Sequence, residues 1–435
     1  MEGYIVSNIA TDSIMAEYHR ELAKQYNIFS IDDSYGSKKA SLENTEKHLA
    51  RYLEKNFNGS DFLFSSFLYR DFLSLWASKS EVEGVLYLSD EDGGVFRRRA
   101  YEAIKDDCGI TLLSELKNYI TYIEENDLEE MDLTGEVESL QSEISEVKIP
   151  EGEYGIIKGD TASVYSPMFI YGFVEDTSKL SENTVDKSQL FSTRKSENMI
   201  NSGNLKLEEI GSGEKLIEKF AFDEYLMRYM GSYMKEGNDN SLEYQIEYIL
   251  NGYPSDIDNL VGTVGRIFGI RFAADFLYLL SDKEKCDIAE AMAVVISVIT
   301  YTEEFIDVYK MLILLIWANM EAQWDVRCLM AGSRIQMVKT KESWYTDLGQ
   351  LADSHNTKGD ESGLSYEDYL RIFLLMTGDH IVNARAMDMV EADIRKTPGN
   401  EDFRIDACID TVAVNIEIQS KFGYLVNYHI KRKYE

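Results

Sequence analysis

The pattern that most directly suggests catalysis is SxxK at residues 192–195, which places a candidate nucleophile, Ser192, three residues before a candidate base, Lys195. Enzymes that use this pattern for acyl transfer also carry SDN and KTG motifs, because all three elements build the site. No SDN follows Ser192, and the nearest equivalent of KTG is Lys-Thr-Pro at residues 396–398. We therefore interpret the SxxK match as a coincidence.

Two other motifs suggest ligand binding but are incomplete. Residues 90–94 (DEDGG) resemble the start of a calcium-binding loop, but Tyr101 occupies the twelfth position, where a bidentate Glu is required. Gly262, Gly265 and Gly269 do not form GxGxxG, and they lie in an apolar helical run rather than at a strand-to-helix turn. We interpret the first motif as a turn and the second as a site of close helix packing.

The histidines offer no metal-ligand spacing. His19, His48, His355, His380 and His429 occur singly, with no HExxH and no second His three or four residues away. A metal site would have to be assembled from distant parts of the chain.

The cysteines also lack a motif. Cys108, Cys286, Cys328 and Cys408 are scattered without CxxC, so neither a zinc ribbon nor thioredoxin-type chemistry is indicated. We expect Cys328 to be a small core residue.

Asp325 and Arg327 are charged residues on an otherwise apolar helix, where a buried charge needs a partner. A structural ion pair explains them better than a ligand site does. With 77 carboxylates in the chain, choosing two as a glycosidase acid and base has no basis without a cleft. The sequence therefore indicates no catalytic residue and no metal ligand. It also indicates no cofactor and no residue that would bind one.

The composition bounds the class of protein. The chain has 435 residues, 44% of them hydrophobic and 12% aromatic, so most of it folds. Its formal net charge of -33 argues against binding to nucleic acid or to anionic lipid, because both repel such a surface. The first residues lack a basic segment followed by an apolar core, so no signal peptide is recognised.

Two uncharged stretches, 291–302 and 311–320, are the most apolar parts of the chain. Both are shorter than the roughly 18–20 residues that cross a bilayer, so we expect both to be buried core helices.

The elements that would carry these residues are mostly helical. Periodicity predicts helices at 4–29, 41–57, 95–123, 214–235, 365–377 and 380–395, and a helical block from 254 to 332. The alternation of apolar and polar side chains predicts strand structure within 72–88 and a C-terminal hairpin. Residues 242–250 form a further alternating stretch. The hairpin has one face formed by Val412, Val414, Ile416 and Ile418, continued by Phe422, Tyr424, Val426, Tyr428 and Ile430. The fold class is therefore α+β and helix-dominated, with a C-terminal antiparallel β-hairpin and a few additional short strands.

Charge divides the chain further. Residues 124–153 contain twelve acidic residues and one Lys, and residues 133–147 carry a short heptad seam, which together suggest a solvated helical arm. Residues 150–213 are rich in loop-forming side chains, and we expect poor order there. We predict three units: an N-terminal helical or α+β unit at 1–125, an acidic arm and loop-rich insertion at 126–213, and a C-terminal helical core with the hairpin at 214–435.

Several blocks resemble a known group of sequences. They are residues 16–36 (AEYHRELAKQYNIFSIDDSYG), 247–260 (EYILNGYPSDIDNL), 314–332 (LLIWANMEAQWDVRCLMAG), 338–344 (VKTKESW) and 363–376 (GLSYEDYLRIFLLM), followed by MDMVEADIRKT and RIDACID near the C-terminus. Together they resemble an uncharacterised family of exported proteins from Clostridia-type Firmicutes, similar to the TadE/TadG-like minor pseudopilins of Tad (Flp) pilus systems. The resemblance covers nearly the whole chain except about residues 126–213.

The resemblance implies a non-enzymatic structural or assembly protein with a large domain on the extracytoplasmic face of the membrane. Its partners would be other pilus or cell-envelope proteins, with no nucleic acid, and its only membrane contact would be an N-terminal anchor helix that this chain lacks. We expect the chain to be a soluble fragment of that protein. Two alternatives stay open: an envelope hydrolase whose carboxylates come from distant residues, and a cytoplasmic scaffold that captures a soluble partner with residues 95–147.

Overall fold

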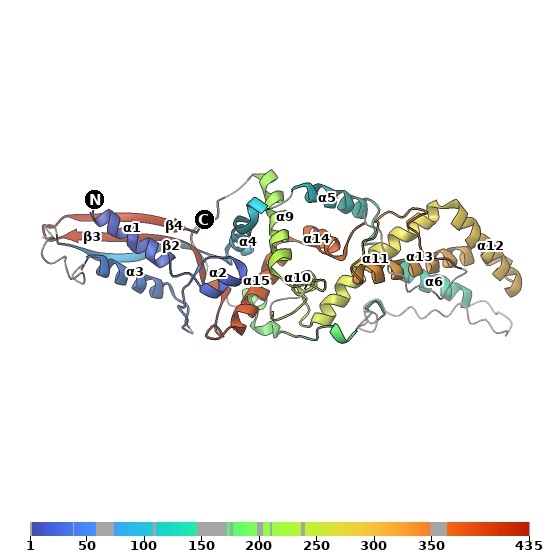
Figure 1. Cartoon of the computed structure of the whole chain (residues 1–435), viewed down its shortest axis with the longest axis horizontal. Coiled ribbons are helices and arrows are strands. Elements are labelled where there is room, and N and C mark those ends of the chain that lie inside the picture. The colour runs from blue at the N-terminus through green and yellow to red at the C-terminus, as the bar shows by residue number, and fades with distance from the viewer. Residues whose placement is uncertain are drawn as a thin grey trace.

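The computed structural model describes residues 2–37, 39–57, 74–107, 110–145, 172–174, 177–197, 203–208, 211–235, 240–348 and 363–434. The molecule is elongated, with a β-sheet at one end and a bundle of long helices at the other (Figure 1). Helices predominate and a β-hairpin lies near the C-terminus, so the predicted α+β, helix-dominated class is confirmed.

The helices are α1 (Glu2–Met15), α2 (Arg20–Tyr26), α3 (Leu42–Phe57), α4 (Asp90–Ile104), α5 (Ile110–Glu125), α6 (Leu133–Ser145), α8 (Phe191–Glu197), α9 (Ser212–Tyr229), α10 (Gln245–Asn251), α11 (Asp256–Ser281), α12 (Lys283–Thr300), α13 (Ile306–Met330), α14 (Tyr366–Met376) and α15 (Asp379–Lys396). The strands are β1 (Ile31–Asp32), β2 (Leu75–Tyr87), β3 (Cys408–Ser420) and β4 (Leu425–Lys433).

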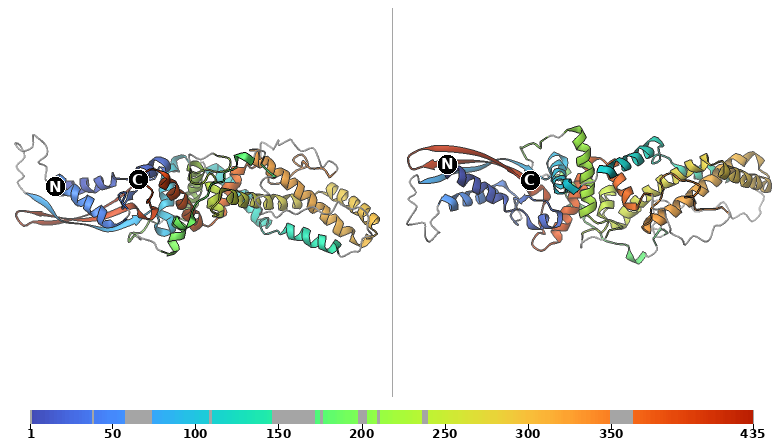
Figure 2. Two further views of the ribbon diagram at one scale, coloured as in Figure 1. Left: turned by 90° about the horizontal axis from the view of Figure 1, so that it is seen from below. Right: turned by 45° about the horizontal axis from the view of Figure 1, so that its top comes forward.

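The sheet joins strands from both ends of the sequence. Strand β3 is central, with β2 antiparallel on one side and with β1 and β4 antiparallel along the other. Side chains alternate across β3, and one face carries the buried residues Val412, Val414, Ile416 and Ile418, as predicted. Helices α1 and α3 pack against this face and complete a small core at this end (Figure 1 and Figure 2).

The tip of the hairpin extends beyond helix α1. Gly3 lies against Ile418, so closely that a β-carbon there would be 3.1 Å from Ile418 Cδ1, and α1 reaches no further along the sheet. The apolar face predicted for the second strand is buried at Ile430, but its first part is exposed at Phe422, Tyr424 and Val426. The prediction of a continuous covered face is therefore wrong at the tip.

Three other predictions of local structure are wrong. The single helix expected at 95–123 is two helices, because α4 ends at Ile104 and a 3₁₀ turn at Lys105–Asp107 precedes α5. The single helix expected at 4–29 is broken between α1 and α2, because the backbone N–H of His19 donates to the carbonyl of Ser30 while its Nδ1 accepts from Leu22 and caps α2. The alternating stretch at 242–250 contains helix α10. Its residues from Gln245 to Ile249 are all buried, so the alternation of apolar side chains does not reflect one-sided burial.

The predicted helical block at 254–332 is confirmed as three helices. Ser255 caps α11 by accepting from the backbone N–H of Asp258, and α11 and α12 both pack on α13. These helices belong to the large core, which continues through α4, α9, α14 and α15.

The acidic segment is less solvated than predicted. Leu128 and Val137 are buried, and α6 packs on α13 with the acidic residues on its outer side. Much of the loop-rich region predicted to be poorly ordered lies outside the described residues, although residues 177–197 form two short 3₁₀ helices and α8. The division into units 1–125, 126–213 and 214–435 stays a prediction.

Candidate functional site

The SxxK serine is part of a structural contact. Ser192 lies in the first turn of α8, and its backbone N–H donates to the Asp388 carboxylate at 2.7 Å. The same carboxylate accepts from the hydroxyl of Tyr248 at 2.8 Å. Burial raises the pKa of Asp388 to about 6, and the hydrogen bonds from Ser192 and Tyr248 oppose that rise. Ser192 thus anchors α8 to α15; the side chain of Lys195 lies outside the described residues.

The calcium-loop candidate forms a turn, as predicted, and this turn lies within the first residues of α4. Asp90 accepts from the backbone N–H of Tyr87 at 2.7 Å and from that of Gly203 at 3.0 Å, so its carboxylate is engaged by the backbone. Glu91, Asp92 and Gly93 all have a positive φ and form the turn itself.

The glycines of α11 behave differently from one another. A β-carbon at Gly262 would meet the side chain of Asn251 in α10 at 2.5 Å, which confirms close packing there. A β-carbon at Gly269 would have no neighbour within 4 Å, so the packing interpretation is wrong at that position.

The histidines are dispersed over separate contacts. His48 Nδ1 lies 2.8 Å from Glu17 Oε2, His429 Nδ1 lies 3.0 Å from Glu83 Oε2, and His19 Nε2 lies 2.9 Å from Asn400. His355 and Cys108 lie outside the described residues. Within the described ranges, no group of three or more His, Cys, Asp or Glu side chains is arranged to hold a metal ion.

Asp325 is buried in an ion-pair network, whereas Arg327 is not part of it. Asp325 Oδ2 accepts from Arg271 Nε at 2.8 Å, and its Oδ1 accepts from Lys339 Nζ at 2.7 Å. Arg327 is half-exposed and donates to the carbonyl of Gly172 at 3.1 Å. The structural ion pair expected here is confirmed for Asp325 and wrong for Arg327, because the two side chains leave the helix in different directions.

The network fastens a loop to two helices. Arg271 of α11 also donates to the carbonyls of Gln336 and Met337 at 2.9 Å, and to Asp275 at 2.7 Å. Lys339 of the loop donates to Glu321 of α13 at 2.7 Å. Since Arg271, Asp275, Glu321, Asp325 and Lys339 are all buried, the network links α11, α13 and residues 336–339 without access to solvent.

The carboxylates of this network stabilise the charge of Lys339, although burial raises the pKa of Asp275 well above its usual value. Burial alone would lower the pKa of Lys339, but the carboxylates of Asp325, Asp275 and Glu321 outweigh burial and raise it. The Lys339 ammonium is therefore charged at neutral pH. Burial also raises the pKa of the Cys328 thiol to about 12, which fits the predicted role of a small, inert core residue.

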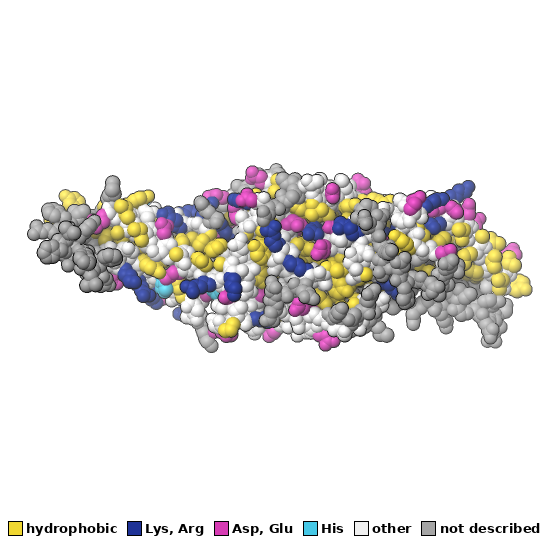
Figure 3. Space-filling model, viewed as in Figure 1, with side chains coloured by type: hydrophobic (Ala, Val, Ile, Leu, Met, Phe, Trp, Pro, Cys, Tyr) yellow, Lys and Arg dark blue, Asp and Glu magenta, His cyan; other side chains and the backbone are white. Residues whose placement is uncertain are grey.

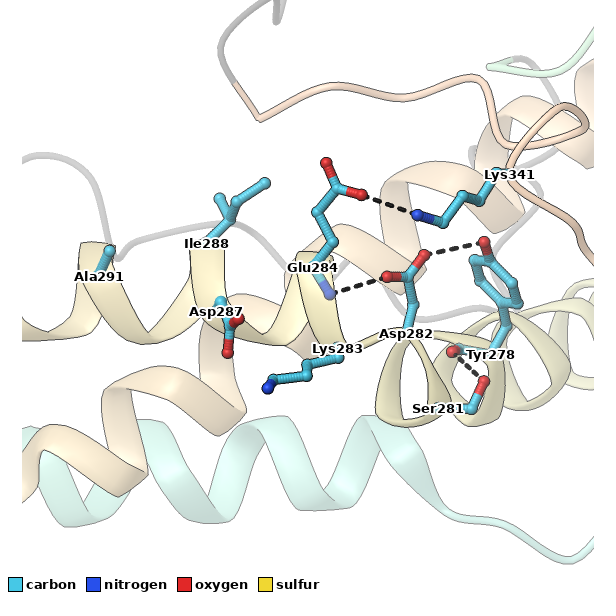
Figure 4. Close-up of a pocket in the computed structure, with 9 residues that line it drawn as sticks. All are labelled: Tyr278, Ser281, Asp282, Lys283, Glu284, Asp287, Ile288, Ala291 and Lys341. Atoms are coloured by element: carbon cyan, nitrogen blue, oxygen red, sulfur yellow. Dashed lines mark hydrogen bonds and ion pairs between the residues drawn. The ribbon is translucent and has the colours of Figure 1, made fainter.

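The loop held by this network forms one wall of a shallow groove at the junction of α11 and α12. Figure 4 shows Lys341 of the loop pointing across the groove to Glu284 of α12, with 2.8 Å between Nζ and Oε2. Asp282 lies between the two helices, where it accepts from Tyr278 at 3.0 Å and from the first backbone N–H groups of α12. Ile288 and Ala291 continue the groove along α12.

Beyond this groove, helix α12 has an unusual distribution of side chains. Its buried side consists of the small residues Ala289, Ala293, Ser297 and Thr300, which allow close approach to α13. Its outward side carries Ile288, Met292, Val294, Val295, Val298 and Ile299, all of them exposed. Val295 keeps 58% of its surface exposed. The prediction that residues 291–302 form a buried core helix is therefore wrong, while residues 311–320 of α13 are largely buried, as predicted.

The turn after α12 extends this apolar surface. Tyr301 has a left-handed φ of 56° and is 85% exposed at the end of the bundle. Thr302 holds the turn by hydrogen bonds to Thr300 at 2.6 Å and Tyr309 at 2.9 Å. Figure 3 shows hydrophobic side chains gathered over this end of the molecule. We call the outward side of α12 together with Tyr301 the α12 face.

The sequence contained the signal for this face but not its orientation. Twelve uncharged residues indicated an apolar helix, and only the position of the small residues against α13 shows which side is buried.

Carboxylates with a raised pKa, such as Asp33 and Glu247, are buried elsewhere and do not line the α12 groove. The hydrolase alternative stays a prediction.

None of the helices in the described part of the chain combines the length and apolar character needed to cross a lipid bilayer.

No curated protein and no solved structure gives a significant match to the chain. A model of a family of unknown function, DUF5702, matches residues 162–420, which is more than half of the sequence and includes the buried network, the α12 face and strand β3. The chain therefore belongs to the DUF5702 family.

Proposed function

We propose that this protein is a structural or assembly component of the cell envelope, and that it binds a helical segment of another envelope protein through the α12 face. The observation that carries the proposal is the reversed polarity of α12, whose small residues face α13 and whose large apolar residues face outward. A solvent-exposed helix usually has the opposite arrangement, and contiguous exposed apolar patches mark interaction sites.

The spacing of the exposed residues favours a helical partner. Ile288, Met292, Val295 and Ile299 follow one another at intervals of four, three and four residues, which is the spacing of a heptad seam. An amphipathic helix with the same spacing could lay its apolar stripe along this face.

The charges around the α12 face favour a basic partner. Glu284 is paired with Lys341 and Glu290 with Lys310, but exposed acidic side chains remain beside the face, three of them at its C-terminal end, whereas Lys283 accompanies the one at its start. They are Asp287, Glu303, Glu304 and Asp307. A second copy of the chain packed in parallel would bring the acidic residues at 303–307 together, which like-charge repulsion disfavours. A partner helix whose apolar stripe is flanked by Lys or Arg meets no such cost.

The opposite end of the molecule suggests how the protein is oriented. The exposed hairpin tip lies beside the start of α1, where Tyr4 and Ile5 are also exposed (Figure 1). Tyr side chains, such as Tyr4 and Tyr424 here, are enriched where proteins meet the membrane surface. We infer that the sheet end faces the membrane on its extracytoplasmic side and that the α12 face is held away from it.

A direct test measures binding of a fluorescent three-heptad amphipathic peptide with Lys flanking its apolar stripe, and of the same peptide with Glu in place of Lys. We expect the whole protein to bind the Lys peptide and not the Glu peptide. The variant Val295→Glu/Ile299→Glu should lose binding, while Ile5→Glu/Ile9→Glu, a matched double change at exposed positions of α1, should retain it. Equal binding of both peptides, or no binding, would contradict the proposal. A dimer in sedimentation that the double variant abolishes would instead identify a second copy as the occupant.

The location is tested in the native host. Cells are fractionated, and each fraction is probed with antiserum to the protein. In a parallel sample, protease is added to intact cells whose walls have been removed, and the same antiserum then shows whether the protein has been degraded. Membrane association together with loss of the signal supports the envelope location. A protected protein in the soluble fraction would overturn it.

A further inference from the structure

The two strongest concentrations of positive charge in the sequence converge on one cavity. Arg97–Arg99 and Lys431–Lys433 are the only runs of three consecutive basic residues in a chain of net charge -33. The first lies in α4 and the second in β4. Arg98 and Arg99 line the same cavity of about 300 Å³ as Lys431 and Lys433, while Arg97 and Arg432 turn away to Asp379 and Asp12.

The cavity has more cations than anions. Its basic residues are Arg98, Arg99, Lys105, Lys206, Lys431 and Lys433, and its acidic residues are Glu102, Glu208 and Asp410. Each of the three carboxylates already has a basic partner from the cavity. Asp410, which is buried, is paired with Arg99, Glu102 lies 2.5 Å from Lys105, and Glu208 lies 3.9 Å from Lys433.

The remaining cations give the cavity its excess charge. Arg98 also forms an ion pair with Glu218, at 3.2 Å, and Glu218 lies outside the cavity. Lys206 and Lys431 have no ion-pair partner among the residues that the structure describes. In a protein whose overall field repels anions, these two exposed lysines beside the partly buried side chains of Arg98 and Arg99 form a local exception.

The wall that carries Lys206 is fixed to the sheet. The backbone N–H of Leu205 donates to the carbonyl of Val85 at 3.2 Å, and Asn204 Oδ1 accepts from the N–H of Val85 at 3.0 Å. Gly203 donates to Asp90 on the other side. Residues 203–206 are therefore positioned along β2, and the cavity is built from the sheet, α4 and this segment.

The lining also has an apolar part. Leu86, Leu205 and Leu207 contribute side chains to a cavity that is otherwise charged. Small-molecule sites combine apolar walls with a few placed polar groups, and about 300 Å³ lies at the small end of their range. Arg and Lys donors together suit phosphate oxygens.

We propose that this cavity binds a compact phosphate monoester, with its phosphate near Lys206, Lys431 and Arg99 and its organic part against the leucines. The proposal is independent of the α12 face and of any helical partner, because the cavity lies at the junction of α4 and the sheet.

The test is calorimetric titration of the whole protein at low salt with phenyl phosphate, inorganic phosphate and benzoate. We expect phenyl phosphate to bind most tightly, since only it offers both a dianion and an apolar body. Binding should weaken as salt is added. Equal affinity for benzoate, or no saturable binding of phenyl phosphate, would overturn the proposal.

Two variants with the same change of charge locate the binding. Lys206→Gln/Lys431→Gln should weaken phenyl phosphate binding by about tenfold or more, because two charge-assisted hydrogen bonds are lost. The control Lys24→Gln/Lys47→Gln removes two exposed lysines from α2 and α3, away from the cavity, and should change affinity less than about twofold. Equal loss in both variants would show diffuse electrostatic attraction and contradict the proposal. Tighter binding of phosphatidic acid vesicles than of phenyl phosphate would assign the phosphate to a lipid headgroup and overturn the small-molecule ligand.

Discussion

Lys339 Nζ lies 2.7 Å from Asp325 Oδ1, and both side chains are buried in the interior of the protein. The same ammonium contacts Glu321, and Arg271 contacts the other oxygen of Asp325. Removing one partner from such a network leaves a buried charge without compensation, which costs more than the ion pair itself contributes.

Lys339→Met should therefore lower the free energy of unfolding by about 3–5 kcal/mol, because Glu321 and Asp325 lose their shared cation. Urea unfolding followed by circular dichroism measures the change. Lys341→Met is the matched control, since Lys341 is two residues away and exposed, and it should alter stability by less than about 0.5 kcal/mol. Similar effects of the two changes would contradict the structural role of Lys339.

Arg327→Ala should have a small effect, below about 1 kcal/mol, although the sequence pairs this residue with Asp325. Among the described residues its side chain donates to the carbonyl of Gly172, and this side chain is half-exposed. Arg271→Ala should cost several times more, because Arg271 is buried and holds Asp275, Asp325 and the loop. The melting temperatures of the two variants test this prediction. A larger decrease for Arg327→Ala than for Arg271→Ala would contradict the conclusion that Arg327 lies outside the buried network.

Glu247 should make stability depend on pH. Burial raises its pKa to about 7, although hydrogen bonds from Tyr233 and Tyr366 oppose the rise. The folded protein thus binds a proton more tightly than the unfolded chain does. Its contribution is fully present below the unfolded pKa of about 4.3 and is lost as pH rises through about 7.

Glu247→Gln should consequently reduce the loss of stability between pH 5 and pH 8, by up to about 3 kcal/mol at the upper end. Urea unfolding at the two pH values gives the difference directly. Glu303→Gln, a change at an exposed residue, is the control and should leave the pH dependence of the parent protein unchanged. An unaltered pH dependence in Glu247→Gln would show that Glu247 is ionised at little cost.

Two glycine substitutions should act in opposite directions. A β-carbon at Gly203 would collide with the Asp90 carboxylate and the carbonyl of Val85, so Gly203→Ala should destabilise the protein and displace the segment that carries Lys206. Gly269 lies on the exposed side of α11 with open space around it, so Gly269→Ala should raise the free energy of unfolding by about 0.5–1 kcal/mol. Thermal unfolding of both variants tests the pair, and a stabilised Gly203→Ala would show that the segment can move.

The sequence by itself determined the elements whose side chains repeat regularly. The alternation at 412–418 predicted the covered face of β3, and the periodicity of 254–332 predicted its helices, because period two and period 3.6 are local properties of a strand and a helix. The pattern failed where a local contact overrides it, as at His19, whose contacts with Ser30 and Leu22 end the first helix and start the next.

Only the tertiary structure decided which surfaces face one another. The composition of α12 indicates an apolar helix, but its exposure depends on α13 packing against Ala289 and Ala293 rather than against Val295. Asp325 required a buried partner, and the fold supplied Arg271 and Lys339, which no spacing could identify. The basic runs at 97–99 and 431–433 are visible in the sequence, yet they share a cavity only because β4 pairs with β3, which in turn pairs with β2 from the first half of the chain. Contacts between distant segments are set by packing, and a local pattern carries no information about them.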